Sequence, residues 1–511
     1  MNLIKSTGTF SFYTILSRIL GYVRDLLIAL NLGSGPITDA FFVAFRIPNT
    51  FRRLFSEGTF NAAFVPSYSS ELIKSKKKAE KFSNRILNFL IISLLAITLV
   101  IEILMPIFIY VIAPGFAENN DKLDLTIKLT RITFPFLFFI SITSFFSAIL
   151  NSHNKFGVAA FAPTVLNLIL IFILFFLNNE NDNLVTYLAY GVSIAGLLQL
   201  IILYFFVKKF FSPKINFNLN FKIDKMIKSF FFKLIPSIFS SGVTQINILV
   251  GTIIASFQAN AVSYLYYADR IYQINLAIAG IAIGIVLLPS LSKYIQSKNK
   301  KKINFIQNKS VELSLFLSLP AMFALIIASE QITSSLFGYG SFDELSVKNS
   351  AKALYYFAFG LPAFALIKIF SSFLFARQNT KIPFYFSLIS VIINILISIS
   401  FFDEVGFIII PISTTISSWI NAILLFVYLK NRNYYYLDLN FIFALLKIFC
   451  SVTFSSYFFY FMINKYSNVL IFNNNYKLLF MMILIIITLL LYFLISIFTK
   501  AFKLSDIKLK Y

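Results

Sequence analysis

Two apolar stretches near the start of the chain, residues 10–31 and 36–58, contain eight ionisable side chains. A charge near the centre of a bilayer costs about 2.5–3.5 kcal/mol on insertion scales, so these side chains are expected to face a protein interior or a water-filled cavity. Arginine outnumbers the acids, which favours an anionic ligand. Because guanidinium groups match phosphate oxygens two at a time, a phosphate or diphosphate fits best. The eight residues are Arg18, Arg24, Asp25, Asp39, Arg46, Arg52, Arg53 and Glu57.

Helical spacing gathers most of these charges on one face of each stretch. At about 100° per residue, the polar residues of the first stretch occupy an arc of about 120°, and four charges of the second lie within about 40°. A polar arc on an apolar helix indicates a face turned toward a polar interior. The first arc holds Ser17, Arg18, Arg24 and Asp25; the second holds Asp39, Arg46, Arg53 and Glu57, while Arg52 points elsewhere.

The same charges also have a simpler interpretation, which the sequence leaves open. In that interpretation the acids neutralise neighbouring arginines in structural ion pairs, a role that does not exclude transport. Arg52 and Arg53 lie near a helix end, where long cationic side chains reach toward lipid headgroups. Two further residues of this kind, Asp269 and Arg270, lie in a later apolar stretch after three tyrosines.

The composition of the chain is that of a membrane protein with many spans. Of its 511 residues, 58% are hydrophobic and only 13% are charged, whereas a soluble domain has about a quarter charged residues. Apolar runs of about 20 residues predict an all-α fold with about fourteen transmembrane helices. These runs cover residues 10–31, 36–58, 86–113, 127–150, 158–178, 184–207, 229–257, 264–291, 310–330, 349–376, 382–401, 406–429, 439–463 and 475–499.

The net charge of +23 is explained by the loops between these helices. If the N-terminus is cytoplasmic, the cytoplasmic segments hold 28 lysines and arginines, whereas the opposite loops hold only Lys122, Lys348 and Lys465. This asymmetry fits the positive-inside rule and predicts that both termini are cytoplasmic. Basic loops also attract anionic membrane lipids. No nucleic-acid partner is expected.

The sequence does not favour enzyme chemistry. His153 is the only histidine and Cys450 the only cysteine, so neither a zinc site nor a Cys/His dyad is available. There is no glycine-rich phosphate-binding loop of the nucleotide-hydrolysing type, and no carboxylate pair is placed for hydrolysis. We therefore expect neither an enzyme nor an ATP-driven pump, and we expect no cofactor or metal.

An internal repeat relates two parts of the chain. Residues 38–69 align without gaps with residues 261–292, and six predicted helices separate them, so the two copies keep the same membrane orientation. The repeat predicts two pseudo-symmetric six-helix lobes. The two helices outside it are almost wholly apolar, and they either pack against lipid or form a groove for a long lipid chain. The predicted parts are residues 1–215 (N-lobe), 216–433 (C-lobe) and 434–511 (the groove and a cytoplasmic tail).

Several segments follow a family pattern. Within residues 17–66 the chain reads SRxxGxxRD and then DAFFVAFRxPNxxRRxFxEGxFxxAFVP; VIAPGF (111–116), RITFPF (131–136), FAPTVLNL (161–168) and ARQNTKIP (376–383) follow. With these segments the sequence resembles the MurJ (MviN) lipid II flippase family, within the multidrug/oligosaccharidyl-lipid/polysaccharide exporter superfamily. The resemblance spans the first twelve predicted helices and is weaker beyond residue 430.

The resemblance implies a fold with two six-helix lobes around a central cationic cavity, and two extra helices that form a hydrophobic groove. It implies that lipid II, an undecaprenyl-diphosphate carrying a disaccharide-pentapeptide, is the substrate. Position by position, it assigns substrate binding to Arg18, Arg24, Arg52, Arg53 and Arg270. It assigns gating or ion pairing to Ser17, Asp25, Asp39, Glu57, Ser263 and Asp269.

We therefore predict a lipid II flippase that works by alternating access in the bacterial cytoplasmic (inner) membrane and serves peptidoglycan biosynthesis. The expected partners are lipid II, membrane lipids and cell-wall synthesis proteins. Two alternatives remain open at this point. One is a flippase for another undecaprenyl-diphosphate-linked glycan, such as O-antigen, and the other is a membrane scaffold that transports nothing.

Overall fold

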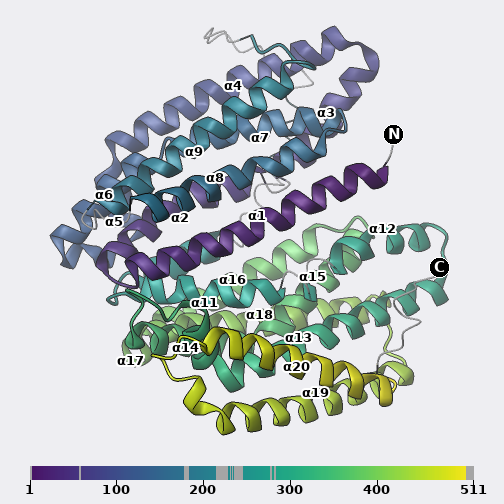
Figure 1. Cartoon of the computed structure of the whole chain (residues 1–511). Coiled ribbons are helices and arrows are strands. Elements are labelled where there is room, and N and C mark those ends of the chain that lie inside the picture. Colours follow the sequence, from purple (N-terminus) through teal and green to yellow (C-terminus); the bar gives the residue numbers. More distant parts are fainter. Residues whose placement is uncertain are drawn as a thin grey trace. The chain divides into compact units, whose positions relative to one another are not determined.

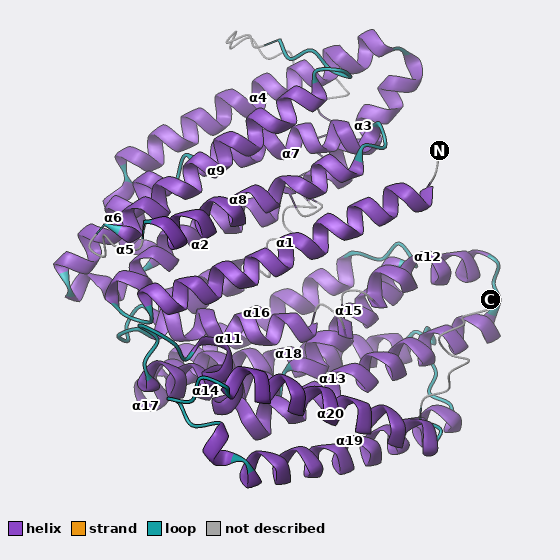
Figure 2. Cartoon of the chain, in the orientation of Figure 1, coloured by secondary structure: helices purple, strands orange, loops and turns teal. Residues whose placement is uncertain are grey.

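The computed structural model describes residues 3–56, 59–177, 183–214, 245–276, 279–280 and 283–501, together with residues 228, 230, 232 and 234. Helices, purple in Figure 2, make up most of this part of the chain, and none of its residues forms a strand. The predicted all-α fold is thereby confirmed. By its internal contacts the chain divides into two compact units, Met1–Ser263 and Tyr264–Tyr511.

The first unit is a bundle in which helices distant in the sequence pack in pairs (Figure 1). α1 lies along α8, α2 lies against α6 and α7, and α9 packs against both α7 and α8. The elements are α1 (Leu3–Leu32), α2 (Pro36–Ser56), α3 (Thr59–Lys74), α4 (Lys76–Ile103), α5 (Met105–Ile112), η1 (Pro114–Glu118), α6 (Asn120–Thr133), α7 (Phe136–Ser152), α8 (Phe156–Phe176), α9 (Leu184–Val207) and a helix at Gln245–Ala255.

The second unit is organised around one long helix, α13, which contacts α12, α14, α15, α19 and α20. α11 begins in the first unit and continues into the second. The elements are α11 (Ala261–Leu276), α12 (Ile283–Gln296), α13 (Lys300–Phe337), α14 (Glu344–Ala358), α15 (Leu361–Phe375), α16 (Lys381–Ser400), α17 (Phe402–Val405), η3 (Gly406–Ile408), α18 (Ile409–Asn431), α19 (Leu439–Lys465), η4 (Ser467–Val469) and α20 (Lys477–Phe498).

Aromatic packing fixes the short helix α3 against its neighbours in the first unit. The ring centroid of Phe64 lies 5.0 Å from that of Phe145 on α7 and 5.6 Å from that of Phe82 on α4. Each such pair contributes about 0.5–1.5 kcal/mol beyond the apolar area that it buries. α3 follows directly after α2, so this packing also holds one end of the helix that carries Asp39.

Among the described residues, nine helices are long and apolar enough to cross a membrane, or ten if α14 and α15 form one bent span. α1 and α2, which carry the charged faces, are not among the nine. A membrane protein with many spans is thus confirmed, and the number fourteen stays a prediction. The predicted division of the chain after residues 215 and 433 also stays a prediction.

Two predicted spans are interrupted in the structure, the first by a local break within one continuous candidate span, Asn120–Ser152, and the second by a bend. The span 127–150 lies within α6 and α7, which meet at Phe134 and Pro135, and the span 349–376 consists of α14 and α15, bent by 44° at Gly360. Proline lacks the amide that an α-helix needs, and glycine favours the helix poorly, so both residues permit a break. Hydropathy continues through both breaks and therefore does not reveal them.

Two charged segments that the sequence places between predicted spans, on the cytoplasmic side, are mostly helical; they are residues 71–85 and 293–309. α4 and α13 begin inside them, and each follows a capping residue, Ser75 or Asn299. The capping oxygens accept hydrogen bonds from the amide three residues further on, at 3.2 and 3.1 Å. Hydropathy locates only the lipid-facing part of a helix, so charged turns beyond the membrane are assigned to loops.

The two copies of the repeat form similar pairs of helices. In the first copy α2 ends at Ser56 and α3 begins at Thr59; in the second, α11 ends at Leu276 and α12 begins at Ile283. In the second unit, α19 and α20 pack on α13, and the Tyr492 hydroxyl donates a hydrogen bond to the Phe316 carbonyl at 2.8 Å. The groove expected along α19 and α20 stays a prediction.

Candidate functional site

Arg24 lies at the centre of a buried polar cluster on the first unit. It extends from α1, which packs along α8, and only 5% of its surface is exposed. Its Nε and Nη2 donate to Oδ1 of Asp25 at 3.0 and 2.6 Å, and its Nη1 donates to Oδ1 of Asn167 at 2.9 Å. We call Arg24, Asp25 and Asn167 the Arg24 cluster. It holds one guanidinium in a fixed orientation between α1 and α8.

The surroundings of the Arg24 cluster fix the guanidinium further. The Phe45 ring of α2 lies 5.4 Å from its central carbon, close enough for a cation–π attraction. The amide Nδ2 of Asn167 donates to the main-chain carbonyl of Ser17 at 2.8 Å, so one side chain of α8 joins two turns of α1. Asp25 offsets the charge of Arg24 from the same helix. An incoming anion therefore competes with a carboxylate that is already in place.

Arg18 differs from Arg24 in its surroundings. Its side chain is exposed, and it forms no hydrogen bond or ion pair with the residues that the structure describes. It lies on the same α1 arc as Ser17 and Arg24. The polar arc of α1 therefore combines a buried, neutralised arginine with an exposed one.

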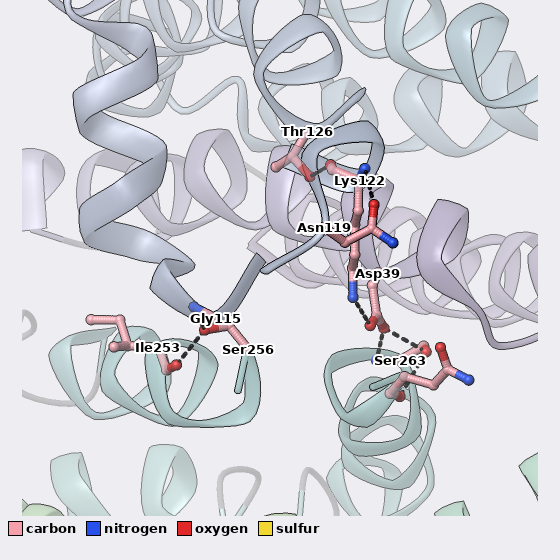
Figure 3. A network of polar contacts seen from close by, with 9 residues as sticks. Asp39, Gly115, Asn119, Lys122, Thr126, Ile253, Ser256 and Ser263 are labelled. Carbon is pink, nitrogen blue, oxygen red and sulfur yellow. Dashed lines mark hydrogen bonds and ion pairs between the residues drawn. The ribbon is translucent and has the colours of Figure 1, made fainter. Parts of the chain in front are cut away.

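A second buried cluster joins α2, α6 and the start of α11 (Figure 3). Asp39 has no exposed surface, and its two carboxylate oxygens have different partners. Oδ1 accepts from the main-chain amide of Ser263 at 2.8 Å and lies 2.7 Å from the Ser263 hydroxyl. Oδ2 accepts from Nζ of Lys122 at 2.8 Å. We call Asp39, Lys122 and Ser263 the Asp39 cluster. It caps the start of α11 with a carboxylate, which suits the positive end of a helix dipole.

The turn before α6 supports the Asp39 cluster, as Figure 3 shows. Asn119 caps α6 by accepting from the Lys122 amide at 3.0 Å, and the Gly115 amide donates to the Ser256 hydroxyl at 3.0 Å. A Cβ on Gly115 would lie 2.5 Å from the Cα of Phe257 and still closer to Ser256. Only glycine permits this close approach between the turn and the segment that leads into α11.

α11 carries the remaining charges that the sequence singles out. Nη2 of Arg270 donates to the Tyr266 hydroxyl at 2.8 Å, and the central carbon of its guanidinium lies 4.6 Å from the centre of the same ring. Asp269 accepts a hydrogen bond from Gln273, one turn further along. Arg270 follows Ser263 by seven residues, about two helical turns, so both lie on nearly the same side of α11.

The structure thus brings some of the predicted site residues together. Arg24 and Asp25 are in contact, with the Ser17 carbonyl joined to the same cluster, and Asp39 contacts Ser263. Arg52 and Arg53 belong to α2, but their side chains lie outside the part of the chain that the structure describes, as does Glu57. Asp25 pairs with a neighbouring arginine, as the interpretation of the acids as structural ion pairs expects. Asp39 instead pairs with a lysine.

Two residues of these clusters were not singled out from the sequence. Asn167 lies within the quoted segment 161–168, and the signal was a lone amide in an apolar helix. The sequence places Lys122 in a loop because the apolar run begins at residue 127, whereas α6 begins at Asn120. Lys368 lies in the middle of α15, and its ammonium has no hydrogen-bond or ion-pair partner among the described residues.

Comparison with known proteins shows what the chain is similar to. A family model described as "Lipid II flippase MurJ" matches residues 28–482. A protein of Rhizobium tropici named "Probable lipid II flippase MurJ" is 41% identical over 440 residues, which cover 85% of this chain and 82% of that protein.

Solved structures show the same similarity at the level of the fold. One described as "Lipid II flippase MurJ, inward closed conformation" has a TM-score of 0.80 and 28% identity, and covers 96% of this chain and 98% of its own. An inward-facing multidrug resistance MATE transporter of the MOP superfamily has a TM-score of 0.65 over 81% of this chain and 94% of its own. At 15% identity, that second likeness concerns the fold alone.

Proposed function

The chain belongs to the lipid II flippase MurJ family, and on that premise we propose that it moves lipid II from the inner to the outer leaflet of the bacterial cytoplasmic membrane. The substrate is undecaprenyl-diphosphate carrying a disaccharide-pentapeptide, the precursor that peptidoglycan biosynthesis consumes outside the membrane. Support comes from the match of the family model over residues 28–482 and from a relative named for this activity at 41% identity. The family is one of transporters, and this assignment requires no covalent chemistry.

The Arg24 cluster is the observation that carries the proposal. A diphosphate is a compact anion with several oxygens, and a guanidinium fork offers it two parallel hydrogen bonds. Arg24 is held by Asn167 and by Asp25, so its donors are oriented before the substrate arrives. We assign the diphosphate to Arg24 and Arg18, and Asp25 releases Arg24 when the substrate oxygens take its place.

Three further arginines complete the proposed binding set. Arg270 of α11 contributes to the same headgroup, while Arg52 and Arg53 attract the substrate near the cytoplasmic end of α2. The gating set consists of Ser17, Asp25, Asp39, Glu57, Ser263 and Asp269. Of these, the contact between Asp39 and Ser263 is the one that we expect to break and re-form during alternating access.

The orientation of the protein follows from the loop charges. Basic loops favour the cytoplasmic side, so we place both termini in the cytoplasm and the Asp39 cluster toward the outer face. Membrane lipids surround the helices, and cell-wall synthesis proteins are the expected protein partners. The isoprenoid chain of the substrate stays in the bilayer or runs along α19 and α20.

The proposal is tested in bacteria whose only lipid II flippase is this chain. The measurement is the fraction of lipid II that an enzyme added outside the cell can cleave. Arg18→Ala and Arg24→Ala are each expected to lower that fraction. Unchanged accessibility in both variants would reject the assigned site. Failure of the unaltered chain to rescue such cells, with rescue of cells that lack an O-antigen flippase, would show that the substrate is another glycan.

A further inference from the structure

We propose that Lys122 is the lasting counter-ion of Asp39, and that it lets the contact between Asp39 and Ser263 open and close without leaving a bare buried carboxylate. This inference rests on the proposed function, because opening of that contact is a step of transport. It assigns to Lys122, a residue of α6, the role of positioning Asp39. Lys122 itself does not touch the substrate.

The first argument is that the two carboxylate oxygens of Asp39 have separate partners. Oδ1 of Asp39 faces the start of α11 and receives both bonds of Ser263, while Oδ2 faces α6 and receives the Lys122 ammonium (Figure 3). The two sets of partners do not share an oxygen. The start of α11 can therefore leave Oδ1 while the ion pair at Oδ2 stays intact.

The electrostatics give the second argument. Asp39 has no exposed surface and Lys122 only 8%, so neither charge has ready access to water. Removing one partner from a buried ion pair is strongly destabilising, since the remaining charge is desolvated and uncompensated. If Ser263 were the only partner of Asp39, each opening would strand the carboxylate in this way. Lys122 removes that barrier because the pair is neutral in both states.

The anchoring of Lys122 gives the third argument. It belongs to the first turn of α6, which Asn119 caps, and Thr126 bonds back to its carbonyl at 2.7 Å. Its ammonium also lies 3.8 Å from the centre of the Phe116 ring, which adds a cation–π attraction. α6 packs against α2. Lys122 and Asp39 thus come from two packed helices, whereas Ser263 comes from a third, α11.

A charge-neutralising pair of substitutions tests the inference. Lys122→Met leaves Asp39 without its cation, and Asp39→Asn leaves the ammonium without its anion. The double variant has no buried charge, and the side-chain amide oxygen that replaces the carboxylate can still accept from Ser263. The control is Lys128→Met, because Lys128 is an exposed lysine on the same helix. Hydrogen exchange of the peptide that contains the start of α11 measures how often the contact opens, and lipid II flipping measures transport.

Lys122→Met is expected to slow exchange by at least about tenfold, because each opening then strands the buried Asp39 carboxylate. Asp39→Asn is expected to speed exchange, because a neutral amide oxygen holds Ser263 less tightly than a carboxylate does. The double variant is expected to exchange faster than Lys122→Met and to flip lipid II faster, because it has no carboxylate to strand. A double variant that exchanges as slowly as Lys122→Met, or a Lys122→Met protein that behaves like Lys128→Met, would overturn the inference. So would restored exchange with transport as low as in Lys122→Met. If the unaltered chain flips no lipid II, the proposed function fails, while the exchange measurements still report on the ion pair.

Discussion

The side-chain oxygen of Asn167 accepts a hydrogen bond from Arg24 at 2.9 Å, and this bond joins α8 to α1 across 143 residues of sequence. The same amide donates to the Ser17 carbonyl at 2.8 Å, so a single side chain satisfies a buried cation and a main-chain oxygen. A hydrogen bond to a charged group contributes about 1.5–3 kcal/mol. Asn167 thus sets the orientation of the guanidinium to which we assign the substrate.

Replacing Asn167 with leucine should weaken transport while Arg24 remains present. The guanidinium loses its Nη1 acceptor, so we expect flipping to fall by about tenfold, the equivalent of about 1.4 kcal/mol. Asn167→Asp should lower it at least as far, because a second carboxylate competes with the diphosphate. The neighbouring exposed residue provides the control, Leu168→Ala. Flipping of Asn167→Leu at the rate of this control would contradict the role of Asn167.

The close approach of Gly115 to residues 256 and 257 predicts an asymmetry between two glycines. In Gly115→Ala the new Cβ would overlap main-chain atoms of Ser256 and Phe257, which cannot move aside as a side chain does. We expect a loss of about 1–3 kcal/mol in stability, typical of overpacking. Gly35→Ala is the matched control, since no atom lies within 4 Å of its Cβ position. Thermal unfolding of the purified protein measures both, and equal melting temperatures would refute the crowding argument.

His153, in the turn between α7 and α8, predicts a dependence of stability on pH. Its ring stacks on Phe210, and its Nε2 lies 3.0 Å from the Tyr68 hydroxyl. Burial, and to a smaller extent the nearby Lys76 ammonium, lower the pKa of His153 below its ordinary value. The unfolded chain therefore takes up a proton more readily than the folded chain, and stability falls as the pH drops through the ordinary histidine pKa of about 6.5.

The slope of that fall stays below the about 1.4 kcal/mol per pH unit that one whole proton would give. His153→Gln removes the titrating group, so its melting temperature should fall less between pH 7 and pH 5.5 than that of the unaltered protein. Equal falls in the two proteins would show that His153 does not contribute.

Lys477 predicts a purely structural effect in the second unit. Only 1% of it is exposed, and its ammonium donates to the carbonyls of Gly338 and Phe472 at 2.6 and 2.5 Å. Lys477→Met should destabilise the protein by about 1–3 kcal/mol, because two buried carbonyls lose their donor. The exposed Lys465 at the end of α19 supplies the control, Lys465→Met. A melting temperature of Lys477→Met no lower than that of the control would refute the stabilising role of these two hydrogen bonds.

The apolar runs of the sequence were sufficient to place most helices. The predicted span 184–207 coincides with α9, whereas the breaks at Pro135 and Gly360 lie inside runs that stay apolar on both sides. The charged arc of α1 was likewise predictable, because helical spacing depends only on local sequence. The partners that Asp39 and Arg24 take from other helices were not predictable, since these partners lie 83 and 143 residues away in the sequence. Only the packing of α2 on α6 and of α1 on α8 selects Lys122 and Asn167 as those partners.

The rate of lipid II flipping by the purified chain in liposomes tests the central claim most directly. The measurement follows lipid II of the inner leaflet as it becomes accessible to an enzyme outside. We predict that Arg24→Ala lowers the rate by at least about tenfold, and that Arg24→Lys also lowers it, since lysine keeps the charge but loses the fork. Arg131→Lys, at an exposed arginine of α6, should leave it unchanged. Flipping by Arg24→Ala at the rate of the unaltered chain would contradict the assignment of Arg24 to the diphosphate.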